Sequence, residues 1–164
     1  MSTFEDVLRT SLLGGVEGQG AHADASNTLD GLDWKLAGRR VPDAPYTIQQ
    51  CANHIIYWNG FSLAVLRGEN PTAPEHDVDS WPGPEAPASA ADWEAFVAAF
   101  KGSLAALSAR IQDGDLEGKT PSGRRLKADV LRAMGNHVSY HVGQIALLRR
   151  MLGAWPPPTG GDTW

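Results

Sequence analysis

Two histidines stand four residues apart near the end of the chain, in the segment Asn136–Gln144. On a helix, His137 and His141 lie one turn apart on the same face. Imidazole nitrogens are standard ligands for zinc, nickel and iron, so the pair can fill two positions of a divalent-metal site. Gln144 returns to the same face seven residues after His137. The alternative is a pair of core histidines bonded to neighbours, and a third ligand on another helix would favour the metal.

Three further histidines are present, and His54 is the best candidate for a third ligand. We expect it on a helix that begins after Thr47, where it faces an apolar stripe as the pair does. His22 follows a run of glycines and His76 lies in an acidic loop, so both are read as ordinary polar residues. Three neutral imidazoles make an open site of the catalytic kind, where a metal can lower the pKa of water or of a thiol.

The residues around the paired histidines exclude one class of enzyme and name two candidate catalytic groups. No glutamate lies between the histidines, which excludes the H-E-x-x-H arrangement of zinc peptidases. Gln144 could bond a ligand imidazole or bound water, and Tyr140 flanks the same face and could donate to a substrate. For Tyr140, a packing role explains the position equally well. Cys51, one turn before His54, could approach the metal, but a buried structural thiol is the favoured interpretation.

The elements that must position these residues are helices. Apolar spacing and capping signals predict an N-terminal helical stretch followed by three long helices, over 3–13, 47–67, 89–111 and 126–152. A second N-terminal piece over 21–32 can also be helical, and whether the two pieces form one bent helix stays open. With no strand pattern, the chain is predicted to be an all-α four-helix bundle with a short N-terminal helical segment, in one domain spanning residues 1–164.

The connections carry a hint about topology. The links before Thr47 and before Leu126 have about a dozen residues each, more than a tight antiparallel turn requires. Each is long enough to run back along a helix, so up-up-down-down wiring with long crossover connections is compatible with the sequence. The segment from Glu69 to Ala88 is rich in proline and acid and fits no regular element. Long loops of this kind often line sites.

The overall charge and composition of the chain indicate which binding partners and which cellular compartment to expect. The net charge of −5 argues against a general affinity for nucleic acid. The single cysteine cannot form an internal disulfide, which fits a reducing cytoplasm. The N-terminus lacks the features of a signal peptide, and no apolar run approaches the ~18 residues of a membrane span. We therefore expect a cytoplasmic chain with no nucleic-acid or membrane partner.

Three segments together resemble a known family. They are Tyr-Thr-Ile-Gln-Gln-Cys-Ala-Asn-His-Ile-Ile-Tyr-Trp at 46–58, Asn-His-Val-Ser-Tyr-His-Val-Gly-Gln-Ile at 136–145, and Leu-Leu-Arg-Arg-Met-Leu-Gly-Ala-Trp-Pro-Pro at 147–157. A histidine on the second bundle helix, then His-x-x-x-His before Gly-Gln, is similar to the pattern of the DinB/YfiT-like superfamily of four-helix-bundle metalloenzymes.

This resemblance implies a three-histidine divalent-metal site, which maps onto His54, His137 and His141, and a homodimer. It also implies a metal-dependent enzyme acting on a small-molecule substrate, in which the site activates a low-molecular-weight thiol such as bacillithiol to attack a small electrophile. Zinc and nickel are the first candidates for the metal, and iron is a third. The alternatives are a metal-dependent hydrolase of a small substrate, or a non-catalytic metal- or ligand-binding dimeric bundle.

Overall fold

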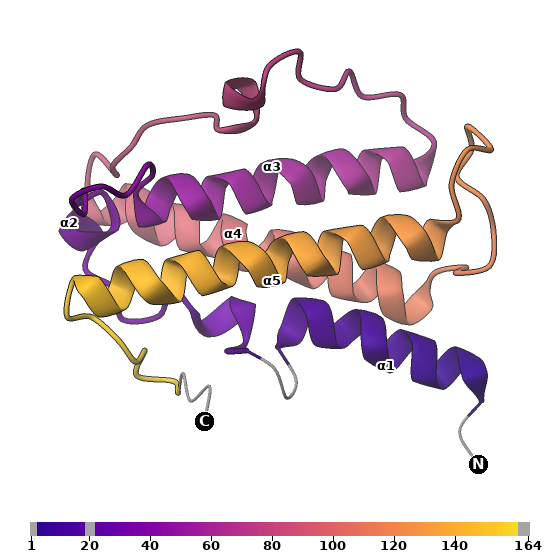
Figure 1. The fold of residues 1–164 in the computed structure, drawn as a ribbon, viewed down its shortest axis with the longest axis horizontal. Coiled ribbons are helices and arrows are strands. Elements are labelled where there is room, and N and C mark those ends of the chain that lie inside the picture. The colour runs from indigo at the N-terminus through magenta and orange to yellow at the C-terminus, as the bar shows by residue number, and fades with distance from the viewer. Residues whose placement is uncertain (1–2, 19–21, 161–164) are drawn as a thin grey trace.

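Four long helices dominate the computed structural model, which describes residues 3–18 and 22–160 (Figure 1). They are α1 (Phe4–Glu17), α3 (Ile48–Arg67), α4 (Ala90–Asp113) and α5 (Lys127–Met151). Three short elements lie between them, the helix α2 (Trp34–Ala37) and the 3₁₀ turns η1 (Ala25–Asn27) and η2 (Asp77–Ser80). No strand occurs in the described residues, so the predicted all-α class is confirmed. None of the helices described is both long and apolar enough to cross a membrane.

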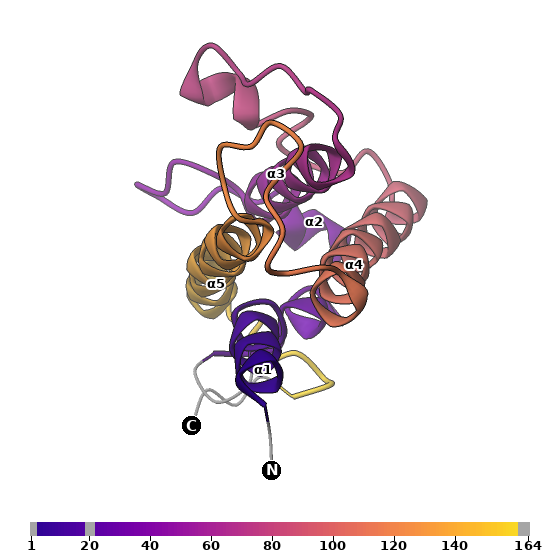
Figure 2. The same ribbon diagram turned by 90° about the vertical axis from the view of Figure 1, so that its right-hand side faces the viewer.

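The four long helices form a square in cross-section (Figure 2). Helix α3 packs against α5 and α4, and α1 packs against the same two helices from the opposite side. The core between them is apolar, and its fully buried side chains include Ile55, Phe100, Leu107, Leu131 and Ile145. Because α3 and α5 are neighbours, residues far apart in the sequence can meet across their contact.

The helices run up, down, down and up, so the up-up-down-down wiring is wrong. In Figure 1, α3 and α4 both run from left to right, whereas α5 returns from right to left, so α3 is parallel to α4 and antiparallel to α5. Parallel neighbours need a return connection, and residues 68–89 supply it by running back over the length of α3 (Figure 1). The crossover is thus the acid- and proline-rich segment, not the two links whose lengths suggested it.

The N-terminal region differs from the sequence prediction in its helical content. Helix α1 continues through Gly14 and Gly15 and ends at Gly18, which adopts a left-handed φ of 77°. A Cβ on Gly15 would lie 3.0 Å from Cα of Gly135, so the glycine lets α1 approach α5 closely. The second piece is not the predicted helix over 21–32, of which Ala21 lies outside the described residues. It contains only the 3₁₀ turn η1, followed by hydrogen-bonded turns.

The helices that carry the histidines begin and end close to the predicted residues. Thr47 caps α3 in a capping box with Gln50, and Gly68 ends the helix with a φ of 90°. Ser89 caps α4 by accepting the backbone N–H of Asp92. Helix α5 begins one residue later and ends one residue earlier than predicted. These local signals place His54 and the histidine pair on well-defined helical faces.

Candidate metal centre

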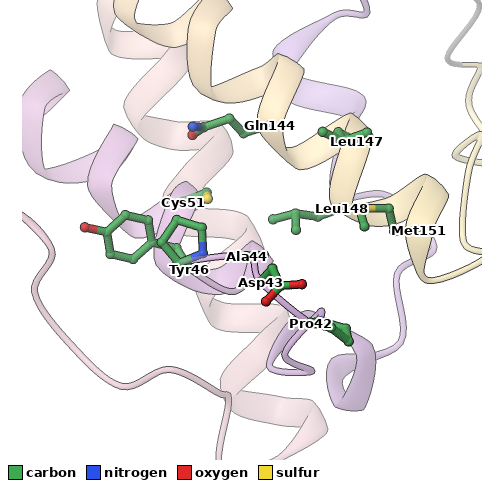
Figure 3. A pocket seen from close by; sticks show the side chains of 10 residues that line it. Pro42, Asp43, Ala44, Tyr46, Cys51, Gln144, Leu147, Leu148 and Met151 are labelled. Atoms are coloured by element: carbon green, nitrogen blue, oxygen red, sulfur yellow. The ribbon is translucent and has the colours of Figure 1, made fainter.

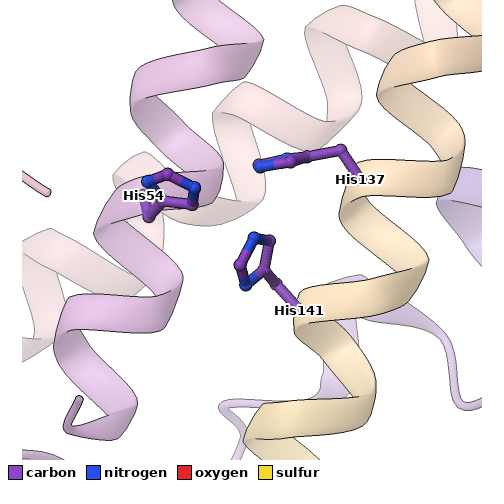
Figure 4. A group of neighbouring side chains, drawn as sticks. All are labelled: His54, His137 and His141. Atoms are coloured by element: carbon purple, nitrogen blue, oxygen red, sulfur yellow. The ribbon is translucent and has the colours of Figure 1, made fainter. Parts of the chain in front are cut away.

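Three histidines meet where α3 crosses α5. His137 and His141 project from one face of α5, and His54 projects toward them from α3 (Figure 4). The ring centroids lie 4.9 Å apart for His54 and His137, 4.7 Å for His54 and His141, and 4.4 Å for the pair on α5. One ligand nitrogen from each ring lies within 4.8 Å of the other two. The three candidate ligands named from the sequence are therefore brought together.

Two of the imidazoles are oriented by hydrogen bonds through Nδ1. His54 donates its Nδ1–H to the backbone carbonyl of Ser80 at 2.6 Å, and His141 donates to Oε1 of Gln144 at 2.7 Å. An oxygen acceptor requires the proton on Nδ1, which leaves the lone pair on Nε2 of each ring. Ligand histidines in metalloproteins are held in this way by outer-shell acceptors. Gln144, a candidate catalytic residue, thus orients a candidate metal ligand.

The third imidazole is not satisfied by protein groups. Nδ1 of His137 is buried and has no hydrogen-bond partner. An unpaired buried polar atom costs about 1–3 kcal/mol, so groups of this kind call for an explanation such as a bound ion. Three imidazoles with available nitrogens match the donor set of zinc, nickel or iron sites. The residues present therefore fit a divalent metal.

Burial keeps all three rings neutral at physiological pH. Removal from water, together with repulsion from His141 and His54, lowers the pKa of His137 to about 3. The pKa of His54 and that of His141 are also lowered, mainly by burial, against the opposing effects of the Ser80 and Gln144 hydrogen bonds. The neutral imidazole is the form that binds a metal, so the cluster is electrostatically prepared for one.

An aromatic stack covers the His54 side of the cluster. The Trp81 ring stacks on His54 with centroids 3.9 Å apart and planes 8° apart, and Tyr46 stacks on Trp81 at 3.5 Å and 7°. Trp81 follows η2 in the crossover, directly after Ser80, whose carbonyl binds His54. Sequence reasoning did not identify Trp81 or Ser80. The only indication in the sequence was that the long segment from Glu69 to Ala88, which contains both residues, was expected to line a site.

The other residues considered from the sequence divide between the cluster and the rest of the molecule. The Tyr140 ring lies 4.9 Å from that of His141, but its side chain is 65% exposed, so it borders the cluster from outside. Cys51 is buried, and burial raises the pKa of its thiol to about 12. His76 is exposed beside η2, and His22 pairs through Nδ1 with the carbonyl of Ala23. Neither of the last two histidines joins the cluster.

The fold and the cluster define a four-helix-bundle protein with a buried three-histidine site of the kind that can hold a divalent metal. The family model of the DinB superfamily matches residues 19–145, which include all three histidines. The chain belongs to the DinB superfamily. It matches no curated protein and no solved structure.

Proposed function

We propose that this protein is a metal-dependent enzyme of the thiol S-transferase type, with His54, His137 and His141 as its metal ligands. The observation that carries the proposal is the convergence of three neutral imidazoles, two of them held by Nδ1 hydrogen bonds so that Nε2 is available. Zinc and nickel are the first candidates for the metal, and iron is the third. A bound divalent ion would supply Lewis-acid chemistry, lowering the pKa of a thiol or of water.

The thiol is preferred over water because the cluster contains no carboxylate. Within the part of the chain that the structure describes, the group that could hold a metal consists of the three histidines alone. Attack by water ordinarily uses a protein base to remove a proton. A low-molecular-weight thiol such as bacillithiol has an ordinary pKa near 8.5 and attacks as its thiolate, which needs no such base. In the proposed reaction the thiol gives its proton to solvent, and the sulfur forms a bond to an electrophilic carbon of a small substrate. The leaving group departs from that carbon with the electron pair of the broken bond.

The protein's own residues have positioning roles in this proposal. The Ser80 carbonyl and the Gln144 amide keep the proton on Nδ1 of His54 and of His141. Trp81 covers one face of His54 and excludes water from it. Tyr140 is largely exposed beside His141, where its hydroxyl can donate to a substrate that arrives from solvent.

The test combines metal analysis with a thiol-transfer assay. Protein purified without a histidine tag should contain close to one equivalent of metal. With bacillithiol and 1-chloro-2,4-dinitrobenzene, it should accelerate formation of the C–S bond and release of chloride. The rate should fall to background after chelation and in His141→Ala, whereas His76→Ala serves as the matched control because that histidine is exposed outside the cluster.

Three outcomes would overturn the proposal. Metal below about a tenth of an equivalent, with no rise in Tm on adding zinc or nickel, would remove the metal site, because a ligand that binds only the folded state must stabilise it. Metal binding without any thiol transfer, but with ester hydrolysis, would identify a hydrolase. Metal binding with neither activity would indicate a binding protein.

A further inference from the structure

A cavity of about 310 Å³ adjoins the histidine cluster on the side of the Tyr46 ring. Its walls come from α5 and from the segment 42–46 that leads into α3 (Figure 3). Leu147, Leu148 and Met151 line the α5 side, opposite prolines of the 42–46 segment. Pockets for small molecules are typically apolar concavities of about 300–1,000 Å³. This one is large enough for a single ring or a short alkyl chain.

Two side chains that line the cavity connect it to the candidate ligands, one by a hydrogen bond and one through stacked rings. Gln144 lines it and accepts the hydrogen bond from Nδ1 of His141. Tyr46 lines it and is the first ring of the stack that continues through Trp81 to His54. A molecule in the cavity is therefore separated from His141 by the Gln144 side chain, and from His54 by the Tyr46 and Trp81 rings.

The mouth of the cavity exposes apolar surface that nothing in the described chain covers. Leu147 and Met151 are each 58% exposed, although both are large apolar side chains on a helix that is otherwise well packed. Covering such surface with an apolar group is favourable because it removes that surface from water. The cavity and its mouth are thus suited to the apolar part of a ligand.

One side chain gives the cavity a charge. Asp43 lines it, is exposed, and makes no ion pair with any residue in the described ranges. Asp43 also adopts a left-handed φ of 63°. Gln144 and Cys51 carry no charge there, since an amide does not ionise and burial raises the pKa of the Cys51 thiol to about 12. An unpaired carboxylate repels anions and attracts cations.

We propose that this cavity binds the apolar group of the substrate used at the histidine cluster, and that Asp43 makes it select uncharged or cationic groups over anionic ones. That the bound molecule is a substrate rests on the proposed function, but binding in the cavity does not depend on the metal. The electrophile is accordingly a compact hydrophobic molecule whose tail carries no negative charge. Cys51 contributes a wall and, as a neutral buried thiol, does not act as the nucleophile.

The experiment measures binding of three probes that share one alkyl chain, hexylamine, hexan-1-ol and hexanoate. Isothermal titration calorimetry on metal-free protein should detect the amine and the alcohol, with hexanoate at least about 5-fold weaker than the amine, as expected for an exposed charge pair. Asp43→Asn keeps a residue that tolerates the left-handed conformation and removes the charge. The three affinities should then agree within about 2-fold. Glu117→Gln, an exposed acid outside the cavity, is the matched control and should leave the parent's order unchanged.

A second variant tests the location. Leu147→Trp should fill the cavity mouth and weaken all three probes together, while Val7→Trp, at a similarly exposed apolar residue on α1, should bind them as the parent does. Equal affinity of the parent for the three probes, binding unaffected by Leu147→Trp, or no binding at millimolar concentration would overturn the proposal. Zinc uptake is measured on separate aliquots of the same metal-free preparations. Probe binding without metal uptake would refute the metal-dependent function and support the cavity as a binding site. Metal uptake without probe binding would refute the cavity proposal and leave the metal-dependent function standing.

Discussion

Helix α5 places nitrogen-bearing side chains in the interior at two points along its length, and their surroundings differ. Arg149, near its C-terminal end, is 1% exposed, and its guanidinium donates to the carbonyls of Thr28, Asp30 and Ala154. It also lies 5.8 Å from the centre of the Trp155 ring. At the middle of the helix His141 is buried and His137 is half-buried. There Nδ1 of His137 has no partner, and His141 and His54 of α3 each use only Nδ1 in hydrogen bonds to the protein.

The difference in hydrogen bonding distinguishes a structural side chain, Arg149, from a candidate functional site. Arg149 ties α5 to two other stretches of chain, because carbonyls from the residues just after η1 and from the segment that follows α5 converge on one guanidinium. A charged group satisfied in this way fixes the position of the backbone around it. The histidine cluster leaves nitrogens unused at short mutual distance, which is unfavourable without a ligand. The site is marked by unused imidazole nitrogens that converge from three rings, since a single unpaired nitrogen also occurs on His22 outside the cluster.

The largest effect should follow from removing a histidine. His137→Ala and His141→Ala each delete one candidate ligand, so zinc uptake should be abolished, while the helical circular dichroism stays close to that of the parent. The fold should tolerate His137→Ala because the change removes an unpaired buried nitrogen. A zinc titration against a competing chelator measures the loss. Parent-like uptake in both variants would show that the cluster is not the metal site; His22→Ala is the control.

The next effect should come from Arg149. Arg149→Met keeps a long side chain but leaves the carbonyls of Thr28, Asp30 and Ala154 without their donor. We expect the free energy of unfolding to fall by about 3–5 kcal/mol, because each unsatisfied buried carbonyl costs about 1–3 kcal/mol. Urea denaturation measures it. Arg132→Met, at an exposed ion pair on the same helix, should cost less than about 1 kcal/mol. A loss no larger for Arg149→Met than for Arg132→Met would contradict the structural role of the buried arginine.

A smaller effect is expected on the face of α5 that packs against α1. In Gly15→Ala the new Cβ would lie 3.0 Å from Cα and 3.1 Å from the carbonyl carbon of Gly135, so the helices must separate. We expect the free energy of unfolding to fall by about 1–3 kcal/mol. Gly143→Ala meets nothing within 4 Å and should stabilise by about 0.5–1 kcal/mol through helix propensity. Thermal unfolding of the two variants gives the comparison. Equal shifts would mean that the close approach of α1 and α5 contributes nothing.

The smallest effect concerns the residue that orients His141. Gln144→Leu removes the acceptor of the Nδ1 hydrogen bond and should weaken zinc binding about tenfold, the lower end for loss of an outer-shell partner. Gln144→Glu retains an acceptor and should bind zinc at least as well as the parent. The same competition titration measures both variants. If Leu and Glu behave alike, Gln144 does not act through His141.

The sequence was sufficient for the local features. The caps at Thr47 and Ser89, the ends of α5 and the shared face of His137 and His141 depend on contacts within one or two turns, and the structure confirms them. His54 was named as the third candidate ligand from its helical face and from the family pattern. In each case the physical cause lies in neighbouring residues, so it can be recognised without the fold.

Tertiary structure alone decided how these pieces are arranged. The direction of α4, the path of the crossover over α3, and the placement of Ser80 and Trp81 on His54 depend on contacts between distant segments. The same holds for α1, which persists through Gly14 and Gly15 because its backbone packs against Gly135. Helix propensity and spacing therefore determined the histidine faces from the sequence. The packing of α3 on α5 brought those faces together and set the cavity beside them.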